Sequence, residues 1–477
     1  MKQFNIFSLL ATVVVVFMLD SCAVNPVTGK KEIMLMSEQK ELALGKQSDP
    51  GVIAYFGLYN DSTLQKFINE KGKKMVAISH RPHLDFKFRV LDSPVVNAFA
   101  VPGGYVYFTR GIMAHFNNEA EFAGVLGHEI GHVTARHGAR QQTGQILGKA
   151  VFIGGMVLSE GVRQNAQAIQ QSIGMMFLSF SRAHESEADK LGVEYSTKIN
   201  YDAKHMANFF KTLKRMQVNS GSTVPTFMST HPDPADRFRK VSQMAAKWQQ
   251  NMDVSKLQVN RNKYLRMIDG LIYGEDPQQG FVEENTFYHP GLKFKFPVPV
   301  DWQTVNSPQQ LQIFPKDQKA VMIFTLAQEK TLQEAANAIS KLDSVQILES
   351  QNVTVNGFPA IALVAQQGKG VKFLSYLIKD GTMIYKFFGV AGAADFQSRL
   401  PYFLNTMKNF RRLTDQRIIN IKPDRIRIKT VPRNSTLSQA FQYFKMPREK
   451  FEELSLINGM RLNDQVKKGM LIKVVSK

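Results

Sequence analysis

The sequence predicts an α+β protein in three parts: a mainly helical region with a small β-hairpin or sheet, an antiparallel α+β domain, and a small strand–helix–helix–strand module. Three observations lead to this prediction. Apolar residues recur at helical spacing through 118–137. Residues 292–390 contain short alternating or apolar runs separated by turn signals. In the tail, 425–475, the pattern predicts two helical segments between two strands.

Residues 1–22 have the pattern of an export signal. Lys2 supplies the positive start, and the apolar stretch 9–19 is too short to span a membrane. Cys22 is the only cysteine, so no disulfide can form within the chain. Its position resembles a bacterial lipoprotein site, at which Cys22 is lipidated and becomes the mature N-terminus. We expect a lipid-anchored periplasmic protein of the outer membrane, with the inner membrane and an ordinary signal peptide as alternatives.

Length and net charge limit the number of domains and the classes of binding partner that we expect. The length suits two or three domains, and the net charge of +20 is spread along the chain. A basic surface can attract nucleic acid, anionic lipid or cell-wall polymer. An exported lipoprotein seldom meets nucleic acid, so we expect no nucleic-acid partner.

After the export signal, the sequence predicts a helical segment and then a group of strands. Residues 37–78 have a helical pattern that breaks at 49–51. The alternating run 86–91 and the two apolar runs of 95–109, separated by a Pro-Gly-Gly turn, predict strands with a hairpin.

The next helix carries the first chemical motif, His128-Glu129-Ile130-Gly131-His132. Residues four apart stack on one helix face, so His128 and His132 can bind one metal ion with Glu129 beside it. Asn117 or Asn118 can cap this helix. The spacing is typical of zinc peptidases.

A second motif follows at 181–192 (SRAHESEADKLG). Catalytic zinc usually takes three protein ligands and leaves a fourth position for water, and Glu185 is the candidate third ligand. In a helix Asp189 lies one turn after Glu185, where it could accept the free ring N–H of a ligand histidine. A solvated acidic helix face is the alternative.

These motifs resemble the HtpX/BepA-like gluzincin zinc metalloendopeptidases over residues 25–241. The resemblance rests on the NPVTGK start at 25–30, the segment 97–104, the histidine motif and the SRxxExEADxxG segment. It implies one zinc ion per chain, with Glu185 as a ligand and Asp189 as a near-site residue.

The resemblance also assigns two further regions. The hairpin is expected beside the zinc, where Asn97 and Ala98 would pair with an extended substrate; a purely structural hairpin is the alternative. His231 falls in a THPxPxxR motif and can fill the fourth zinc position in a latent state. Arg237 could stabilise the transition state or anchor the loop.

Between and after these motifs the sequence predicts supporting elements. The apolar, glycine-rich run 144–158 is expected to pack near the cleft, as a lid or a core helix, and the glutamine-rich run 164–171 to be exposed. Helices are predicted at 203–216 and 234–250. The metallopeptidase domain therefore spans 25–250.

A linker with one helix is expected at 251–280, followed by the antiparallel accessory domain at 281–412. That domain has no cluster of residues suited to chemistry and is expected to bind or position. The tail, 425–477, resembles a LysM module, which implies peptidoglycan binding, although its first helix departs from the usual pattern at 432–435. A structural cap is the alternative.

The chemistry expected is peptide hydrolysis. Zinc held by His128, His132 and Glu185 acidifies water and polarises the scissile carbonyl, while Glu129 acts as general base and Asp189 orients a ligand. We expect a zinc endopeptidase of the cell envelope that cleaves misfolded or unassembled envelope proteins. The alternatives are an outer-membrane assembly chaperone with latent protease activity and a peptidoglycan-binding scaffold.

Overall fold

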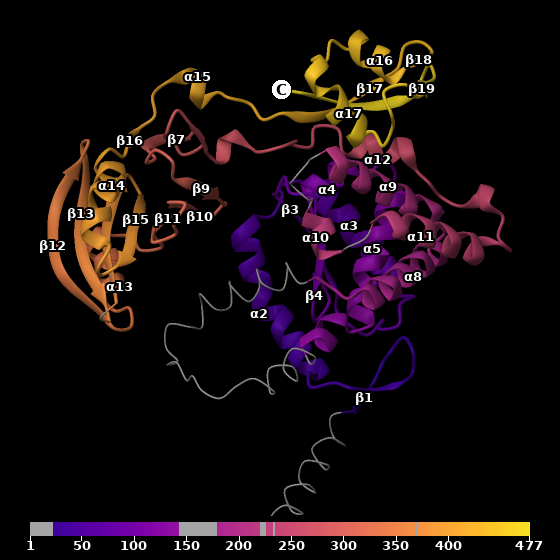
Figure 1. Ribbon diagram of the computed structural model, residues 1–477, viewed down its shortest axis with the longest axis horizontal. Helices are drawn as coiled ribbons and strands as arrows, with labels where there is room; N and C mark the ends of the chain where they lie inside the picture. Colours follow the sequence, from indigo (N-terminus) through magenta and orange to yellow (C-terminus); the bar gives the residue numbers. More distant parts are fainter. Residues whose placement is uncertain (1–21, 143–178, 220–225, 232–233, 369) are drawn as a thin grey trace, which may run out of the picture.

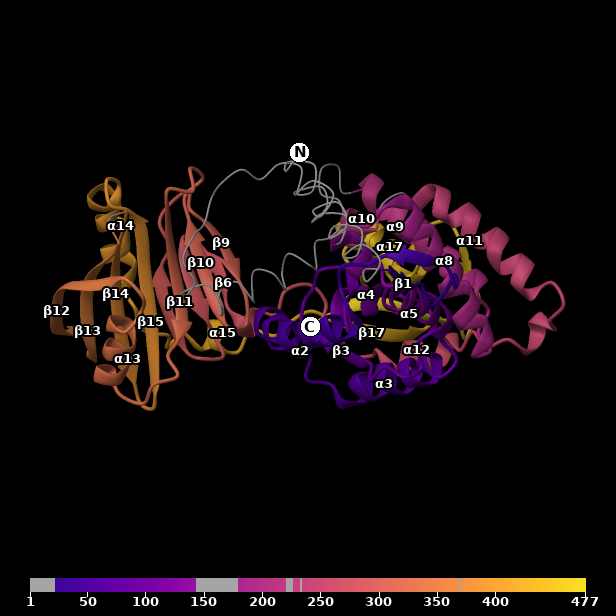
Figure 2. The ribbon, with the colours of Figure 1, turned by 90° about the horizontal axis from the view of Figure 1, so that it is seen from below.

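The computed structural model describes residues 22–142, 179–219, 226–231, 234–368 and 370–477. A helical lobe and a strand-rich lobe lie apart, and the C-terminal module sits on the helical lobe (Figure 1, Figure 2). Among these residues no helix combines the length and apolar character needed to span a bilayer. The expected signal segment, the side chain of Cys22, and the runs 144–158 and 164–171 lie outside the described residues.

The chain enters the helical lobe through a two-stranded ribbon, β1 (Cys22–Val24) and β2 (Lys31–Ile33). Two helices follow, α2 (Glu38–Phe56) and α3 (Ser62–Val76). The Ser37 side chain caps α2 by accepting from the backbone N–H of Lys40. The helices predicted within 37–78 are confirmed, but the break predicted at 49–51 is wrong: α2 runs through Pro50 and ends before Gly57, whose φ is +73°.

The small sheet has three strands, β3 (Lys87–Leu91), β4 (Ala98–Val101) and β5 (Tyr105–Thr109), in the order β3-β5-β4. The predicted hairpin joins β4 and β5, and its turn has Gly103 and Gly104 at φ values of +87° and +94°. Only glycine adopts that conformation readily. Strand β4 pairs with β5 alone and leaves its other edge unpaired within this sheet.

Six helices in the described part of the chain complete most of the lobe, and the histidine motif lies on α5, which Asn118 caps. Helices α9 and α11 confirm those predicted at 203–216 and 234–250. The six are α4 (Arg110–His115), α5 (Glu119–Thr134), α8 (Arg182–Lys198), α9 (Lys204–Asn219), α10 (Thr226–Thr230) and α11 (Pro234–Gln249).

The segment expected as a linker is partly core. It contains η1 (Val254–Lys256), α12 (Arg261–Met267) and η2 (Pro277–Gln279). Tyr264 and Leu265 are fully buried in the main apolar cluster, and the Tyr264 hydroxyl donates to the Met113 carbonyl at 2.7 Å. The one helix predicted in this segment is therefore present as α12, and its packing against α5 extends the helical lobe beyond residue 250.

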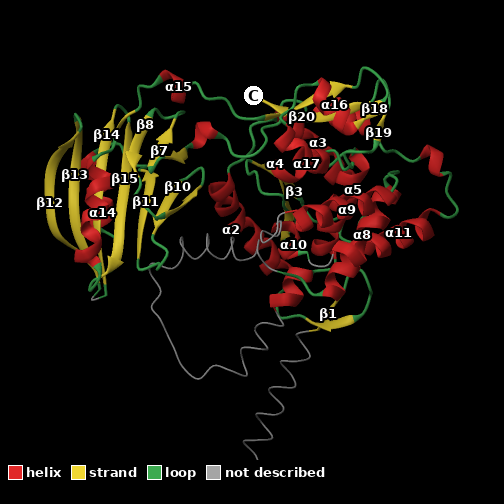
Figure 3. Cartoon of the chain, turned by 45° about the horizontal axis from the view of Figure 1, so that its top comes forward, coloured by secondary structure: helices red, strands yellow, loops and turns green. Residues whose placement is uncertain are grey.

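The strand-rich lobe is antiparallel, as expected, with a seven-stranded sheet in the order β12-β13-β14-β15-β11-β10-β9 and a four-stranded sheet in the order β16-β8-β7-β6 (Figure 3). Helix α13 packs on one face of the larger sheet and α14 on the other. The elements are β6 (Phe281–Glu283), β7 (Thr286–His289), β8 (Phe294–Pro297), β9 (Gln303–Asn306), β10 (Gln310–Phe314), β11 (Ala320–Leu326), α13 (Leu332–Ser340), β12 (Val345–Val355), β13 (Phe358–Gln367), β14 (Val371–Asp380), β15 (Met383–Gly392), α14 (Phe396–Lys408) and β16 (Arg411–Arg412).

The C-terminal module has the predicted strand–helix–helix–strand order, with its outer strands paired antiparallel. Its elements, after α15 (Gln416–Ile419), are β17 (Arg425–Thr430), β18 (Ser435–Thr436), α16 (Leu437–Tyr443), η3 (Arg448–Lys450), α17 (Phe451–Ile457), β19 (Gln465–Val466) and β20 (Leu471–Ser476).

This module shares one apolar core with the helical lobe. Ile426, Phe441 and Ile472 belong to the same buried cluster as Phe122 of α5. Arg215 of α9 donates to the Met460 carbonyl at 2.7 Å. The module is therefore joined to the lobe by burial rather than only by a connecting chain.

Candidate metal centre

Two glycines allow helices α5 and α8 to approach closely. A Cβ placed on Gly192 of α8 would lie 2.9 Å from the Gly124 carbonyl oxygen of α5, and one on Gly131 would lie 3.0 Å from the Leu191 Cβ. Larger residues at these positions would force the helices apart. The close contact places the predicted carboxylate of α8 over the histidine pair of α5.

Four buried side chains, His128, His132, Glu185 and His231, present one donor atom each within 4.8 Å of one another. The Nε2 atoms of His128 and His132 are 3.0 Å apart. The Glu185 carboxylate lies 3.5 Å from Nε2 of His128 and 3.4 Å from Nε2 of His132. The structure thus brings together the three ligands predicted from the sequence and the proposed fourth.

The donor set fits zinc. Imidazole nitrogens and a carboxylate are its usual ligands, and four donors in a buried pocket match its preferred coordination number. Both Nδ1 atoms face other hydrogen-bond partners, which leaves the two facing Nε2 atoms free to bind a metal. Burial disfavours the charged ring and lowers the pKa of His132 well below its usual value, so it is neutral, as a ligand must be.

Glu129 lies beside this group and is fully buried. Neither of its carboxylate oxygens has a hydrogen-bond partner among the described residues. Burial raises its pKa above the usual value, although His231 and His128 oppose the shift. A buried, unpartnered carboxylate next to a metal centre is suited to accept a proton.

Asp189 and Arg237 form a second layer around the ligands. Asp189 Oδ1 is 3.0 Å from His128 Nδ1, the contact expected from the sequence. Arg237 donates from Nε and Nη2 to Asp189 at 2.9 and 2.6 Å, and its Nη1 lies 3.0 Å from Glu185 Oε2. Burial alone would raise the pKa of Asp189, but the Arg237 charge and the His128 contact hold it below its usual value.

His231 follows α10, and its backbone N–H donates to the Phe227 carbonyl at 2.8 Å. Its ring stacks on Phe227 with centroids 4.5 Å apart. Nδ1 lies 3.0 Å from Glu185 Oε1 and 3.2 Å from His128 Nε2, while Nε2 is 3.7 Å from Glu129 Oε1. His231 therefore lies between the metal donors and Glu129.

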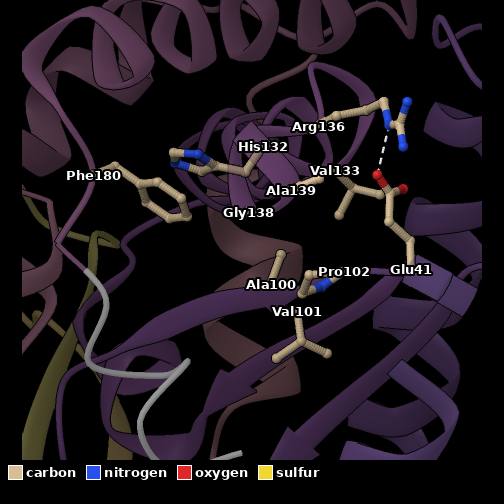
Figure 4. Close-up of a pocket in the computed structure, with 10 residues that line it drawn as sticks. All are labelled: Glu41, Ala100, Val101, Pro102, His132, Val133, Arg136, Gly138, Ala139 and Phe180. Carbon is tan, nitrogen blue, oxygen red and sulfur yellow. Dashed lines mark hydrogen bonds and ion pairs between the residues drawn. The ribbon is translucent and has the colours of Figure 1, made fainter. Parts of the chain in front are cut away.

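Strand β4 borders the centre. Asn97 and Ala98 stand at its start, both buried, and Asn97 Oδ1 has no partner among the described residues. Further along, Ala100, Val101 and Pro102 line a small cavity of about 20 Å³ together with His132 and Phe180 (Figure 4). The edge strand and the metal ligands thus meet at one place.

The sequence reasoning missed three residues at this centre. Phe180 stacks on the His132 ring with centroids 4.2 Å apart. His137 Nδ1 lies 2.9 Å from His132 Nδ1, and Glu187 Oε2 lies 3.1 Å from His137 Nε2. The signal that could have revealed His137 is a further histidine five residues after His132, just beyond the helix end at Thr134.

Residues 62–245 match the family model "Peptidase family M48". The chain is similar to the putative beta-barrel assembly-enhancing protease of Vibrio cholerae, with 32% identity over 38% of each chain. It is also similar to the beta-barrel assembly-enhancing protease of Escherichia coli (strain K12), with 29% identity over 46% of each chain.

A third relative is the mitochondrial metalloendopeptidase OMA1 of Arabidopsis thaliana, 30% identical over 39% of this chain and 36% of that one. The matches to these three relatives therefore span less than half of their length. Among solved structures, LpqN of Mycobacterium tuberculosis is 15% identical, covers 25% of this chain and 83% of its own, and has a TM-score of 0.22.

Proposed function

We propose that this protein is a zinc endopeptidase of the bacterial cell envelope, because residues 62–245 match the model of peptidase family M48, a family of zinc-dependent metallopeptidases. Its substrates in this proposal are misfolded or unassembled envelope proteins. The observation that carries the proposal is the buried group of His128, His132, Glu185 and His231 with the unpartnered Glu129 carboxylate beside it.

The residues of the chain have distinct roles in the proposed hydrolysis. His128, His132 and Glu185 hold zinc, which when bound supplies Lewis acidity that acidifies water and polarises the scissile carbonyl. Glu129 takes the proton of the attacking water and returns it to the leaving amine. Its raised pKa favours proton uptake, and among the described residues neither of its oxygens has a hydrogen-bond partner that would compete for that proton.

Asp189 keeps His128 in the form that binds metal, because an acceptor at Nδ1 holds the proton there and leaves Nε2 free. Arg237 acts as an anchor, since it bridges the carboxylates of Asp189 and Glu185 across α8. That placement favours the anchoring role over direct stabilisation of the transition state.

An extended substrate would add to the sheet at β4. Its edge offers backbone groups that no other strand of this sheet uses. Asn97 would add a side-chain hydrogen bond through its unpartnered oxygen, and Ala98 a backbone bond. Peptide bound there would run beside His132, because the far end of the same strand lines the cavity next to that ring.

The position of His231 supports a latent resting state. With His231 the group offers four protein donors, as many as a structural zinc ion usually takes, so a zinc ion held by all four would have no position for water. His231 also lies between the ligands and Glu129, so it must leave for turnover. This feature favours, as second candidate, an assembly chaperone whose protease activity is held in reserve.

The envelope location rests on the lipoprotein-like Cys22 and on relatives named for β-barrel assembly. In this proposal lipidated Cys22 anchors the chain to the outer membrane. Glycan binding by the C-terminal module remains a prediction from the sequence.

The test compares the purified mature wild type with the variants Glu129→Gln and His231→Ala, with His83→Ala as an exposed-histidine control. We expect one zinc per chain in all four, casein cleavage reduced about 10²–10⁴-fold in Glu129→Gln, and cleavage raised in His231→Ala. Zinc binding with no cleavage in any protein would favour the chaperone. Absence of zinc from the wild type would overturn the metal centre.

A further inference from the structure

The two ligand histidines are supported in different ways. Nδ1 of His128 faces a carboxylate, Asp189, at 3.0 Å. Nδ1 of His132 instead faces another imidazole, His137, at 2.9 Å. The side chain of His137 is fully buried, and its ring stacks on that of His184 with centroids 4.4 Å apart.

A metal ion bound to His132 would determine which ring nitrogen carries the proton in His132 and in His137. Zinc at Nε2 of His132 requires the ring proton to be on Nδ1. That N–H must then donate to Nδ1 of His137, which can accept only if the His137 proton is on Nε2. The next acceptor is in place, because His137 Nε2 lies 3.1 Å from Glu187 Oε2.

The chain of contacts continues to the N-terminal segment. Arg140 donates from Nη1 to Glu187 at 3.0 Å, and its Nε lies 3.0 Å from Glu32 Oε2 in β2. Asn25 Nδ2 donates to Glu32 Oε1 at 3.1 Å. Asn25 is buried, and its Oδ1 accepts from the backbone N–H groups of Val27 and Thr28.

We propose that His137 and Glu187 are positioning residues for the zinc ligand His132, held in place by the N-terminal turn at 25–30 through Arg140 and Glu32. The inference rests on the proposed zinc site. It gives the NPVTGK segment a physical role, since the turn orients Glu32, which fixes Arg140 against Glu187. Glu187 in turn selects the His137 tautomer that accepts from His132.

Four variants test this role. His137→Leu removes the acceptor, whereas His137→Asn keeps an oxygen near the Nδ1 position. Glu187→Ala removes the carboxylate at a partly exposed position. It is therefore expected to fold, and it can still test the proposal if His137→Leu does not fold. Glu194→Ala is the matched control, because Glu194 lies on the same helix and, among the described residues, its carboxylate pairs with Lys198 one turn away, at 2.8 Å.

Zinc affinity is measured by competition with a chromophoric chelator, and ligand geometry by the visible spectrum of the cobalt-substituted protein. We expect zinc affinity to fall about 10–100-fold in His137→Leu and about tenfold in Glu187→Ala, with changed cobalt bands in both. His137→Asn should recover most of the affinity and the spectrum, and Glu194→Ala should match the wild type.

Wild-type affinity and an unchanged cobalt spectrum in folded Glu187→Ala and His137→Leu would overturn the positioning role. Failure of His137→Asn to exceed His137→Leu would do the same. A wild type that binds no zinc would instead overturn the proposed function. Glu32→Ala tests the contribution of the N-terminal turn through Arg140. A small loss of zinc affinity with an altered cobalt spectrum would support that contribution. Affinity and spectrum identical to the wild type would remove the N-terminal turn from the proposal.

Discussion

The ammonium group of Lys473, on the last strand of the chain, lies 2.8 Å from the carbonyl oxygen of Phe116, three residues before the start of the helix that carries the metal ligands. The same group donates to the Ala114 carbonyl at 2.8 Å. Burial lowers the pKa of Lys473 to about 7 and raises that of Glu121, in the first turn of α5, to about 7. The C-terminal module thus supports the start of α5, the helix that carries the candidate ligands His128 and His132.

Lys473→Met is expected to destabilise the whole helical lobe. Two buried carbonyl groups lose their donor and Glu121 loses a nearby positive charge, so the free energy of unfolding should fall by about 3 kcal/mol. Denaturant unfolding measures the change. Lys468→Met, at an exposed position in the same module, is the control and should differ little; equal stability of both variants would contradict the role of Lys473.

Deletion of residues 425–477 should unfold the metal centre rather than only remove a binding module. Ile426 and Ile472 of the module belong to the same buried apolar cluster as residues of α5. The deletion would therefore expose the apolar residues of the helical lobe in that cluster. We expect loss of soluble folded protein and of zinc binding, measured by circular dichroism and metal content. A truncated chain that stays folded and binds zinc would show that the module is independent.

Gly192→Ala should weaken zinc binding through helix packing. The added Cβ would lie 2.9 Å from the Gly124 carbonyl oxygen, so α5 and α8 must separate. Such overpacking costs about 1–3 kcal/mol of stability and moves Glu185 away from His128 and His132. Thermal unfolding and chelator competition measure the two effects. Gly370→Ala, where a Cβ meets nothing within 4 Å, should leave both unchanged.

His115 should make the protein less stable in acid. Burial lowers its pKa from 6.5 to about 4. As the pH falls below 6.5 the unfolded chain binds a proton at this residue and the folded chain does not, so stability is lost between pH 6.5 and about 4. The full contribution is about 3 kcal/mol.

The measurement is denaturant unfolding of the zinc-free protein at several pH values, for wild type and His115→Gln. The variant should lose less stability than the wild type across this range. His83→Gln, at a largely exposed site, should follow the wild type. Parallel pH profiles for all three proteins would refute the assignment to His115.

The local patterns of the sequence were reliable where one element carries the information. Helix α5 places His128 and His132 on one face because their spacing is a property of the α-helix itself, and Asn118 caps it as expected. Glu185 and Asp189 are one turn apart on α8 for the same reason. The antiparallel strands and the Asn356-Gly357 turn were likewise readable from alternation and turn residues.

Contacts between segments far apart in the chain could not be predicted from the sequence. The linker expected at 251–280 contains α12, which became core because Tyr264 fills space beside α4 and α5, and no local pattern shows what a helix will pack against. His137 was missed because its partner, Glu187, comes from another helix. The C-terminal module looked autonomous from its own element order, whereas its burial is shared.

By itself, therefore, the sequence determined the helices, the strands and the identity of the donor groups, since periodicity and side-chain chemistry are local properties. Only the tertiary structure decided that Gly192 brings α8 against α5, that His137 contacts His132 and that Lys473 supports the start of α5. These relationships depend on close packing between residues far apart in the chain, and such packing is set by the whole core.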